Sequence, residues 1–452
     1  MKTATEILAR PAHVQFSPSP TGPPRSAMGI LARPTGKYAA AILIALVAAC
    51  FRLLPRKLRD LILERLRLKA KVDKSIWPND AWVNKRCEDA IDPDMEIIDP
   101  HHHLWDPRFE PKGWDVPQEQ IQAFYAMTSP VDLTEIVKAD MVRKGGQASL
   151  NSFGWRQPPF VQPYKGPEFL LDIRNRDRGK RGHNVVKTVY LECGWSDMTV
   201  EEALRPIGEV KMVESVHALF PSLCNGIVGY ANLCLPDVEK TLQGLAEHKT
   251  VKGIRHALAW TSDKAISGAD AKEDTASDPD FRKGFALLEK YGFSYDVWAF
   301  HEQLGQLTDL AKAFPNQVII LDHVAEPLGI GSYTQKGTWP KWKKGIEELA
   351  KASENVMVKL SGLAMCRTGF RHDERDVPPT SSELAKDWGP YFKVVIEAFG
   401  VERCMFASNF PVDKVSTDYT VMWNAFKLIV KDYTAEDKRL LFYENAARIY
   451  RL

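Results

Sequence analysis

Two histidines, His101 and His103, stand two positions apart directly after the short apolar run at residues 95–98. Side chains alternate between the two faces of a strand. If the run is a strand, Asp99, His101 and His103 share one face and His102 points to the other. Two imidazoles on one face can bind a metal ion or a substrate oxygen together. The alternative is a polar strand end whose histidines are only hydrogen-bonded.

The elements that would position these histidines follow from the rest of the chain. After residue 93, short runs rich in β-forming residues alternate with stretches of helical periodicity. The expected strands lie within residues 95–98, 185–193, 224–233, 251–258, 293–299, 317–323, 355–363 and 403–409. The expected helices lie within residues 200–220, 236–248, 280–291, 301–314, 341–353 and 388–399. This pattern predicts an α/β fold, a (β/α)8 TIM barrel. An open doubly wound sheet is the alternative, although no glycine-rich nucleotide-binding motif follows a strand.

Polar side chains end each of the expected strands. In a barrel of this kind, chemistry takes place where the strands end. Besides His101 and His103, the residues there are Glu192, Asn232, Arg255, His256, Asp296, His301, Asp322, His323, Lys359, Ser361, Ser408, Asn409 and Asp413. Any one of them could have a purely structural role, but so many at one rim predict a binding pocket.

Several segments also match a known family. In chain order they are IIDPHHHLWDP at 97–107, GHNVVKTVYLEC at 182–193, GIRHALAW at 253–260, YDVWAFHEQL at 295–304, IILDHVAEP at 319–327, VKLSGL at 358–363, MFASNFPVDK at 405–414 and FYENAARIYRL at 442–452. Residues 97–452 therefore resemble the amidohydrolase-related family of the amidohydrolase superfamily, TIM-barrel proteins often described as metal-dependent hydrolases. Within that family the chain is most similar to the branch of sugar lactonases and 2-pyrone-4,6-dicarboxylate lactonase.

The resemblance implies roles for individual residues. A metal ion, if present, would be held by His101, His103, His301 and His323. The expected catalytic residues are His101, His103, His323, Asp322 and Asp413, and Arg255 would contact substrate together with Trp105, Glu192, His256, Asp296, Lys359 and Asn409. Strand eight departs from the family, because members with G-S-D-W-P have an aspartate where this chain has Asn409. An amide cannot act as a general base and is a poor ligand for a transition metal. Asp413 or Asp322 could take over that role.

Together these features predict a hydrolase that opens a lactone or similar ester of a small carboxylated or polyhydroxylated substrate. The histidines would polarise the carbonyl, with or without one divalent metal ion (zinc or manganese), and a carboxylate or His323 would activate water. Metal-independent catalysis stays open, because the resemblance implies lactonases whose histidines act as hydrogen-bond donors. Two alternatives remain: a metal-dependent decarboxylase of an aromatic or unsaturated acid, and a catalytically inactive barrel attached to a membrane.

The residues before position 90 fall outside the resemblance. Residues 1–37, rich in Pro, Ser, Ala and Gly, are expected to be disordered or a targeting segment. Residues 38–90 are expected to form an apolar helix and a basic amphipathic linker, of which residues 38–71 would attach the protein to a membrane surface or bilayer. The alternatives are a cleaved presequence that leaves a soluble organellar enzyme, and a helix packed on the catalytic domain, residues 91–452. The long segment 117–183 could form a lid over the pocket.

Charge and cysteine usage narrow the partners and the compartment. The 60 Lys and Arg residues nearly balance 58 Asp and Glu residues, giving a net charge of +2, so no nucleic-acid partner is predicted. The seven cysteines are scattered, without a C-x-x-C pair, which predicts reduced thiols in a reducing compartment. The expected partner is a small-molecule substrate, and the sequence leaves open whether the protein forms a homo-oligomer.

Overall fold

A computed structural model describes residues 80–105, 164–175, 178–195, 199–264, 266, 268–269 and 271–452. All of them belong to one compact unit, residues 73–452. The expectations for residues 1–37 and 38–71 lie outside the described residues, as does most of the expected lid at 117–183. None of the helices in the described part of the chain is long and apolar enough to cross a membrane.

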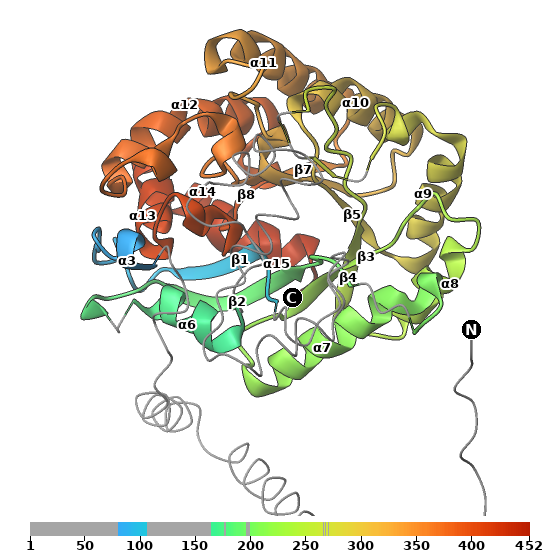
Figure 1. The fold of residues 1–452 in the computed structure, drawn as a ribbon, viewed down its shortest axis with the longest axis horizontal. Coiled ribbons are helices and arrows are strands. Elements are labelled where there is room, and N and C mark those ends of the chain that lie inside the picture. Colours follow the sequence, from blue (N-terminus) through green and yellow to red (C-terminus); the bar gives the residue numbers. More distant parts are fainter. Residues whose placement is uncertain are drawn as a thin grey trace, which may run out of the picture. The chain divides into compact units, whose positions relative to one another are not determined.

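Eight parallel strands form the centre of the fold and pair in sequence order (Figure 1). They are β1 (Glu96–His102), β2 (Asn184–Leu191), β3 (Gly226–Tyr230), β4 (Val251–Arg255), β5 (Ser294–Val297), β6 (Ile319–Leu321), β7 (Val356–Leu360) and β8 (Cys404–Phe406). The last strand returns to the first, since the amide of Asn409 donates to His101 O and the amide of His103 donates to Phe410 O, both over 2.8 Å. The predicted (β/α)8 barrel is therefore confirmed, and the open sheet is wrong.

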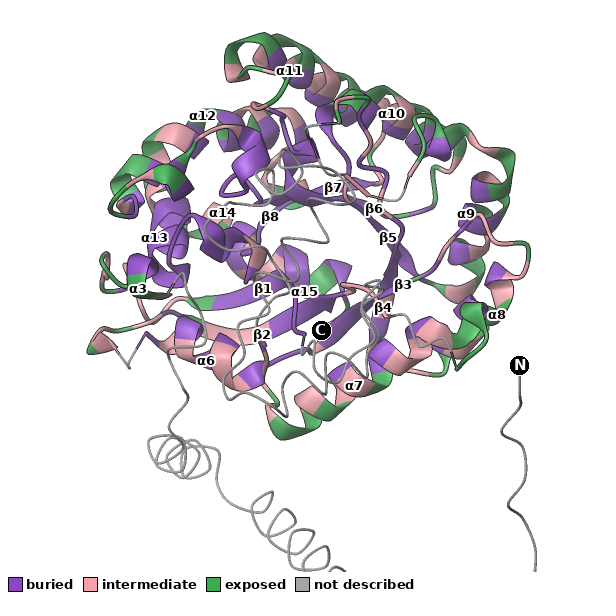
Figure 2. Ribbon diagram, in the orientation of Figure 1, coloured by how far each residue is buried: buried purple, intermediate pink, exposed green. Residues whose placement is uncertain are grey.

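Helices surround the strands, and most of them bury one side, whereas α13 (Tyr419–Ile429) is buried along almost its whole length (Figure 2). The longer ones are α6 (Gly166–Arg174), α7 (Arg205–Leu219), α8 (Val238–Ala246), α9 (Pro279–Tyr291), α10 (Leu304–Ala313), α11 (Gln335–Ala352), α12 (Ser381–Phe399) and α13 (Tyr419–Ile429). Helix α9 shows why they form, because Phe281, Phe285 and Leu288 recur at helical spacing on its buried face. It begins where Asp278 accepts from the amide of Asp280 and ends at Gly292 in the left-handed region (φ 66°).

The C-terminal residues close the end of the barrel where the strands begin. After α14 (Ala435–Arg439), the short helix α15 (Asn445–Ile449) is anchored by Asn445, whose amide donates to the carbonyls of Val401 and Cys404 at the start of β8. Ile449 and Tyr450 pack against side chains inside the barrel, including Ile98 and Met405. The opposite end, where the polar residues were predicted, is thus the end available for a pocket.

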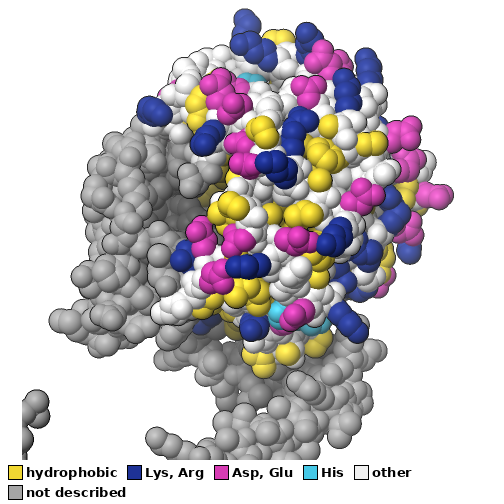
Figure 3. Space-filling model, turned by 90° about the vertical axis from the view of Figure 1, so that its right-hand side faces the viewer, with side chains coloured by type: hydrophobic (Ala, Val, Ile, Leu, Met, Phe, Trp, Pro, Cys, Tyr) yellow, Lys and Arg dark blue, Asp and Glu magenta, His cyan; other side chains and the backbone are white. Residues whose placement is uncertain are grey.

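The outer surface and the cysteines agree with the sequence analysis. Acidic and basic side chains are interspersed on the face drawn in Figure 3, as the small net charge suggests. The cysteines in the described residues are free thiols, at positions 87, 193, 224, 234, 366 and 404. Their location fits the predicted reduced state.

Candidate active site

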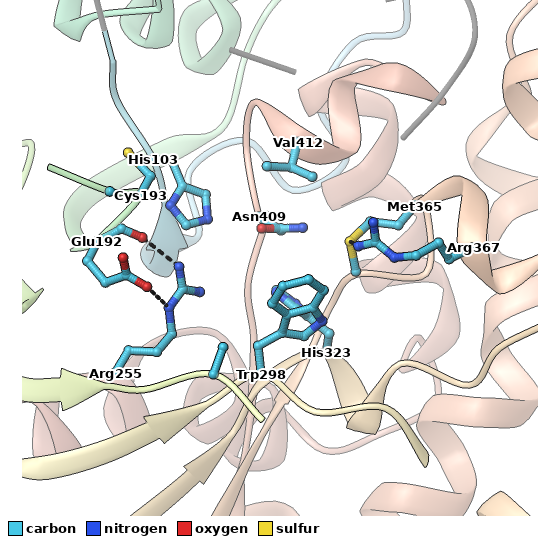
Figure 4. A pocket seen from close by; sticks show the side chains of 12 residues that line it. His103, Glu192, Cys193, Arg255, Trp298, His323, Met365, Arg367, Asn409 and Val412 are labelled. Carbon is cyan, nitrogen blue, oxygen red and sulfur yellow. Dashed lines mark hydrogen bonds and ion pairs between the residues drawn. The ribbon is translucent and has the colours of Figure 1, made fainter. Parts of the chain in front are cut away.

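A cavity of about 290 Å³ opens at the rim where the strands end. Its described lining comes from seven of the eight strands or the loops that follow them, and consists of His103, Glu192, Cys193, Gly194, Arg255, Ala257, Trp298, His323, Met365, Arg367, Asn409 and Val412 (Figure 4). Five of the residues predicted from the sequence are in this set, namely His103, Glu192, Arg255, His323 and Asn409. The predicted rim is therefore a real pocket in the structure.

The first-strand histidines face each other as the alternation predicted. His101 Nε2 lies 3.2 Å from His103 Nε2, while His102 turns outward to Thr188 Oγ1 at 2.8 Å. Asp99 differs from the expectation, because it accepts hydrogen bonds from Ser408 instead of joining the histidines. A register shift between Asp99 and His102 interrupts the alternation there.

Hydrogen bonds fix the proton positions of this pair. Burial lowers the pKa of both His101 and His103 well below the ordinary value, so both rings are neutral at physiological pH. His103 Nδ1 lies 2.9 Å from the carbonyl of Leu191, which can only accept, so this nitrogen carries the proton. His103 Nε2 is then an acceptor, and His101 Nε2 must donate to it. His101 Nδ1 is left without a proton.

A buried charge cluster lies next to His101. Lys359 Nζ is 2.6 Å from Asp296 Oδ1, 3.0 Å from Asp322 Oδ1 and 3.3 Å from His101 Nδ1. All four side chains are completely buried. Burial raises the pKa of the Asp296 carboxyl to about 6, against the opposing effect of Lys359. Burial acts to raise the pKa of Asp322, but the Lys359 ammonium together with His101 and His323 outweighs it, and the net pKa is well below the ordinary value.

Arg255, the last residue of β4, is held in place by Glu192, the residue that follows β2. Its Nε donates to Glu192 Oε1 over 2.7 Å and its Nη2 donates to the Glu192 carbonyl over 2.5 Å. The third nitrogen, Nη1, lies 3.6 Å from Asp322 Oδ2. Glu192 thus fixes the orientation of Arg255 at the pocket wall (Figure 4), and Asp322 lies near its remaining nitrogen.

The other wall contains residues that the sequence analysis missed. Arg367 Nε donates to Glu326 Oε1, and Trp298 Nε1 donates to Glu326 Oε2, each over 2.6 Å. The Arg367 guanidinium also lies over the Trp298 ring, 5.1 Å from its centre. Arg367 and Met365 belong to the loop after β7, beyond the strand ends that the sequence analysis searched, so only the matched SGL segment just before them pointed to this region.

His323 reaches the pocket through an unusual backbone. His323, Val324 and Ala325 all have positive φ, between 50° and 58°, directly after β6. Such a run is strained for residues with a Cβ and persists only where the surroundings impose it. A Cβ at Gly362, which itself has φ 75°, would come within 2.4 Å of His323 Cβ. The glycine of the VKLSGL segment therefore makes room for the pocket histidine.

On strand eight, Asn409 lines the pocket and Asp413 lies behind it. Asn409 Nδ2 donates to Asp413 Oδ1 over 2.8 Å. Burial raises the pKa of the Asp413 carboxyl well above its ordinary value. Among the described residues, Asp413, Asp322, Asp296 and Lys359 are outside the set that lines the cavity.

Three further predicted residues lie away from the pocket lining as described. Trp105 is buried and pairs through its backbone with Tyr164. His256 Nδ1 accepts from the amide of Leu233 over 3.1 Å, a contact that supports the loop after β3. His301 packs edge-on against the ring of Tyr333. The structure therefore does not bring His301 together with the other histidines of the expected metal site.

A group that could hold a metal ion consists of His101, Asp322 and His323, whose ligand atoms lie within 4.8 Å of one another. The donor types suit a transition metal. However, Lys359 Nζ already contacts Asp322 Oδ1 and His101 Nδ1, so a positive charge adjoins two of the three members. The donor atoms of these residues suit a metal ion, but the charges around them do not.

The family profile described as Amidohydrolase matches residues 198–452, more than half of the chain. The chain belongs to the amidohydrolase family. An uncharacterised protein from Sinorhizobium fredii is 32% identical over 362 residues, which cover 79% of this chain and 99% of that protein. The L-rhamnono-gamma-lactonase of Scheffersomyces stipitis is 27% identical over 224 residues, 46% of this chain and 61% of that enzyme.

Among solved structures, an amidohydrolase from Burkholderia multivorans with bound zinc superimposes on this amidohydrolase with a TM-score of 0.54. The two share 18% sequence identity, and the match covers 79% of this chain and all of the other. At that identity the likeness shows the fold, which agrees with the barrel described above.

Proposed function

We propose that this amidohydrolase opens the lactone ring of a neutral, polyhydroxylated small molecule by attack of water. The observation that carries the proposal is the pocket in which His323, His103 and Arg255 meet at the carboxyl ends of the strands. The named relative, an L-rhamnono-gamma-lactonase, supports a sugar lactone as substrate. The decarboxylase alternative has no specific support from the pocket.

His323 is the proposed general base. Its Nδ1 lies 2.9 Å from Ser361 Oγ, which orients the ring and directs Nε2 to the pocket. Burial lowers the pKa of His323 to about 3, so the ring is neutral at physiological pH and can accept a proton from water. A base of such low pKa is weak. It suits a reactive lactone better than an amide.

Arg255 is the proposed oxyanion partner. Water adds to the lactone carbonyl, and the negative charge that develops on the carbonyl oxygen is stabilised by the fixed guanidinium. The carbonyl then re-forms, the ring C–O bond breaks, and protonated His323 returns its proton to the departing ring oxygen. The product is an open-chain hydroxy acid, and His323 is neutral again.

The charge balance of the pocket favours a neutral substrate. Each arginine of the lining is already paired with a buried or half-buried glutamate, Arg255 with Glu192 and Arg367 with Glu326. A substrate carboxylate would therefore meet no surplus positive charge. Hydroxyl groups, in contrast, can donate to Glu192 or to the Asn409 carbonyl and accept from the arginines.

A metal ion is not required in this proposal. Of zinc and manganese, zinc suits the two imidazoles and one carboxylate of the candidate group better. Bound there, it would supply a Lewis acid near the carbonyl. We propose that chelators leave the turnover of the purified protein essentially unchanged.

Attachment to a membrane through residues 38–71 is a separate proposal that rests on the sequence. The apolar run at 39–51 followed by eight Lys or Arg residues up to position 71 is typical of segments that bind anionic bilayers. Flotation of the full chain with anionic and with neutral vesicles tests it. Binding to neither kind of vesicle would contradict it.

The proposed function is tested with a panel of three compound classes at equal concentration: neutral sugar lactones, dicarboxylated pyrone lactones and aromatic carboxylic acids. We expect turnover of the first class, with kcat/KM at least about tenfold above the second, because the arginines are already paired. Preference for the dicarboxylated lactones would refute the neutral substrate. Release of carbon dioxide from the acids would refute hydrolysis.

A further inference from the structure

We propose that Lys359 is a built-in cation that takes the electrostatic place of a metal ion in this barrel and holds the histidine pair in an arrangement that excludes one. Lys359 is thus a positioning residue rather than one that contacts substrate. The inference does not depend on the identity of the substrate, because metal content and histidine protonation can be measured without any substrate.

The ammonium group is coordinated as a metal ion would be. It donates hydrogen bonds to Asp296 Oδ1 over 2.6 Å and to His101 Nδ1 over 3.3 Å, and it forms an ion pair with Asp322 Oδ1 at 3.0 Å. All of these side chains are completely buried. From the opposite side, Tyr450 donates to the same Asp296 oxygen over 2.6 Å, and its ring lies 5.4 Å from Lys359 Nζ. The C-terminal residues therefore fix the lysine in place.

The direction of the hydrogen bonds depends on this lysine. Lys359 donates to His101 Nδ1, His101 Nε2 donates to His103 Nε2 over 3.2 Å, and His103 Nδ1 donates to Leu191 O over 2.9 Å. The carbonyl can only accept and the ammonium can only donate. With both ends fixed, and with neutral rings, only this arrangement of protons satisfies these three contacts, and Asp322 Oδ1, 3.4 Å from His101 Nδ1, then receives no proton from His101.

That arrangement conflicts with metal binding. A metal ion ligated by the Nε2 atoms of His101 and His103 needs a lone pair on each. The His101 proton would have to move to Nδ1, which lies 3.3 Å from the Lys359 ammonium and 3.4 Å from Asp322 Oδ1, so Lys359 would lose His101 as an acceptor. A metal ion held by His101, Asp322 and His323 would share Asp322 with the same ammonium. In either position the ion and Lys359 compete.

The formal charges of the side chains around Lys359 also disfavour a bound metal ion. Asp296, Asp322 and Glu192 bring three carboxylates, and Lys359 with Arg255, which pairs with Glu192 and lies 3.6 Å from Asp322 Oδ2, brings two cations, so the formal charge is −1 and a divalent ion would make it +1. A divalent ion would leave a buried surplus of positive charge, which a low-dielectric interior strongly disfavours. Removing the lysine charge should open the site to a metal.

The experiment measures zinc bound to the full-length protein by elemental mass spectrometry after equilibration with zinc and desalting, together with the zinc dissociation constant by titration. The test variant is Lys359→Met. Because that change leaves a buried carboxylate unpaired, Lys359→Met/Asp296→Asn serves as a second variant that keeps the charges matched. Lys427→Met is the matched control, since Lys427 is a buried lysine of α13 that donates to the backbone carbonyls of Ile91 and Asp92, away from the pocket.

We expect wild type and Lys427→Met to lose zinc on desalting, and the Lys359 variants to retain it with an affinity about 10- to 100-fold higher. Stoichiometric zinc on the wild type, or equal affinities in wild type and variants, would overturn the proposal. Nitrogen-15 spectra of the wild-type histidines give a check that needs no variant. We expect His101 protonated at Nε2 and His103 at Nδ1, and a His101 proton on Nδ1 would overturn the inference.

Discussion

The side-chain amide of Asn409 donates a hydrogen bond to Asp413 Oδ1 over 2.8 Å. This contact fixes the amide so that its carbonyl oxygen turns to the side of the pocket where His103 and Arg255 lie (Figure 4). The carboxyl group of Asp413, in the turn after β8, is thus behind Asn409 and outside the cavity lining, so an amide stands between it and a substrate. Asn409, which stands where the G-S-D-W-P pattern has an aspartate, therefore takes part in the local hydrogen bonding.

Asn409→Asp is expected to destabilise the protein at neutral pH. It replaces the donor to Asp413 with a second acceptor, and two carboxyl groups at this distance cannot both be ionised. We expect a loss of about 1–3 kcal/mol in the free energy of unfolding, measured by urea denaturation. The double variant Asn409→Asp/Asp413→Asn exchanges donor and acceptor and should recover most of the loss. Equal instability of the single and double variants would contradict this account.

His323→Gln is expected to lower kcat by about 10²- to 10⁴-fold, because it removes the proposed base and retains a polar side chain. The matched control is His372→Gln, which changes a buried histidine that packs on Phe370 away from the pocket. Circular dichroism and thermal unfolding establish that both variants are folded. Equal activity of His323→Gln and wild type would exclude His323 as the base.

Arg255→Lys should reduce kcat more than it raises KM. A lysine cannot reproduce the two-point contact with Glu192 that orients the guanidinium, and it leaves the developing oxyanion with a displaced charge. We expect a loss of about 10²- to 10³-fold in kcat, as for removal of one oxyanion donor. Arg367→Lys, on the opposite wall, should mainly raise KM. If the two variants change kcat and KM in the same way, the separate roles expected for Arg255 and Arg367 are wrong.

His102 predicts a specific pH dependence of stability. Burial lowers its pKa from 6.5 to about 3, so between these values the unfolded chain binds a proton that the folded chain does not. The contribution of His102 therefore favours unfolding increasingly as the pH falls from 6.5 to 3, by about 1.4 kcal/mol per pH unit. The substitution His102→Gln removes this pH-dependent contribution to the free energy of unfolding. Urea unfolding of wild type and variant at pH 7, 6 and 5 should give curves that converge or cross, and parallel curves would contradict the assignment.

The barrel was predictable from the sequence because its eight strands are short apolar runs separated by amphipathic helices. The boundaries were less predictable, and proline is one reason. The helix expected at 341–353 extends back to Gln335, past Pro340, whereas the helix expected at 388–399, which already contained Pro390, extends back to Ser381. Proline costs one intrahelical hydrogen bond, a loss that packing of the buried side chains of α11 and α12 can offset. Periodicity alone does not reveal that compensation.

The pocket was predictable where its residues end a strand. His103, Glu192, Arg255, His323 and Asn409 all do so or follow directly, and parallel strands bring such positions to one rim. Arg367 escaped notice because it lies in the loop well beyond the end of β7. Trp298 directly follows β5 but was missed because only the polar side chains at the strand ends were considered. The sequence also could not show how deeply each residue is buried. Lys359, Asp296 and Asp322 were therefore grouped with substrate-contacting or catalytic residues, although they form a buried cluster.

The central claim is hydrolysis of a neutral lactone by this chain, and ring opening of L-rhamnono-gamma-lactone and other neutral sugar lactones in oxygen-18 water tests it most directly. Purified wild-type protein treated with a chelator should open at least one of them, with one oxygen-18 atom in each product carboxylate, and His323→Gln should not. Folded wild-type protein that leaves every lactone at its spontaneous rate of opening, or that acts only after zinc is added, would contradict the account.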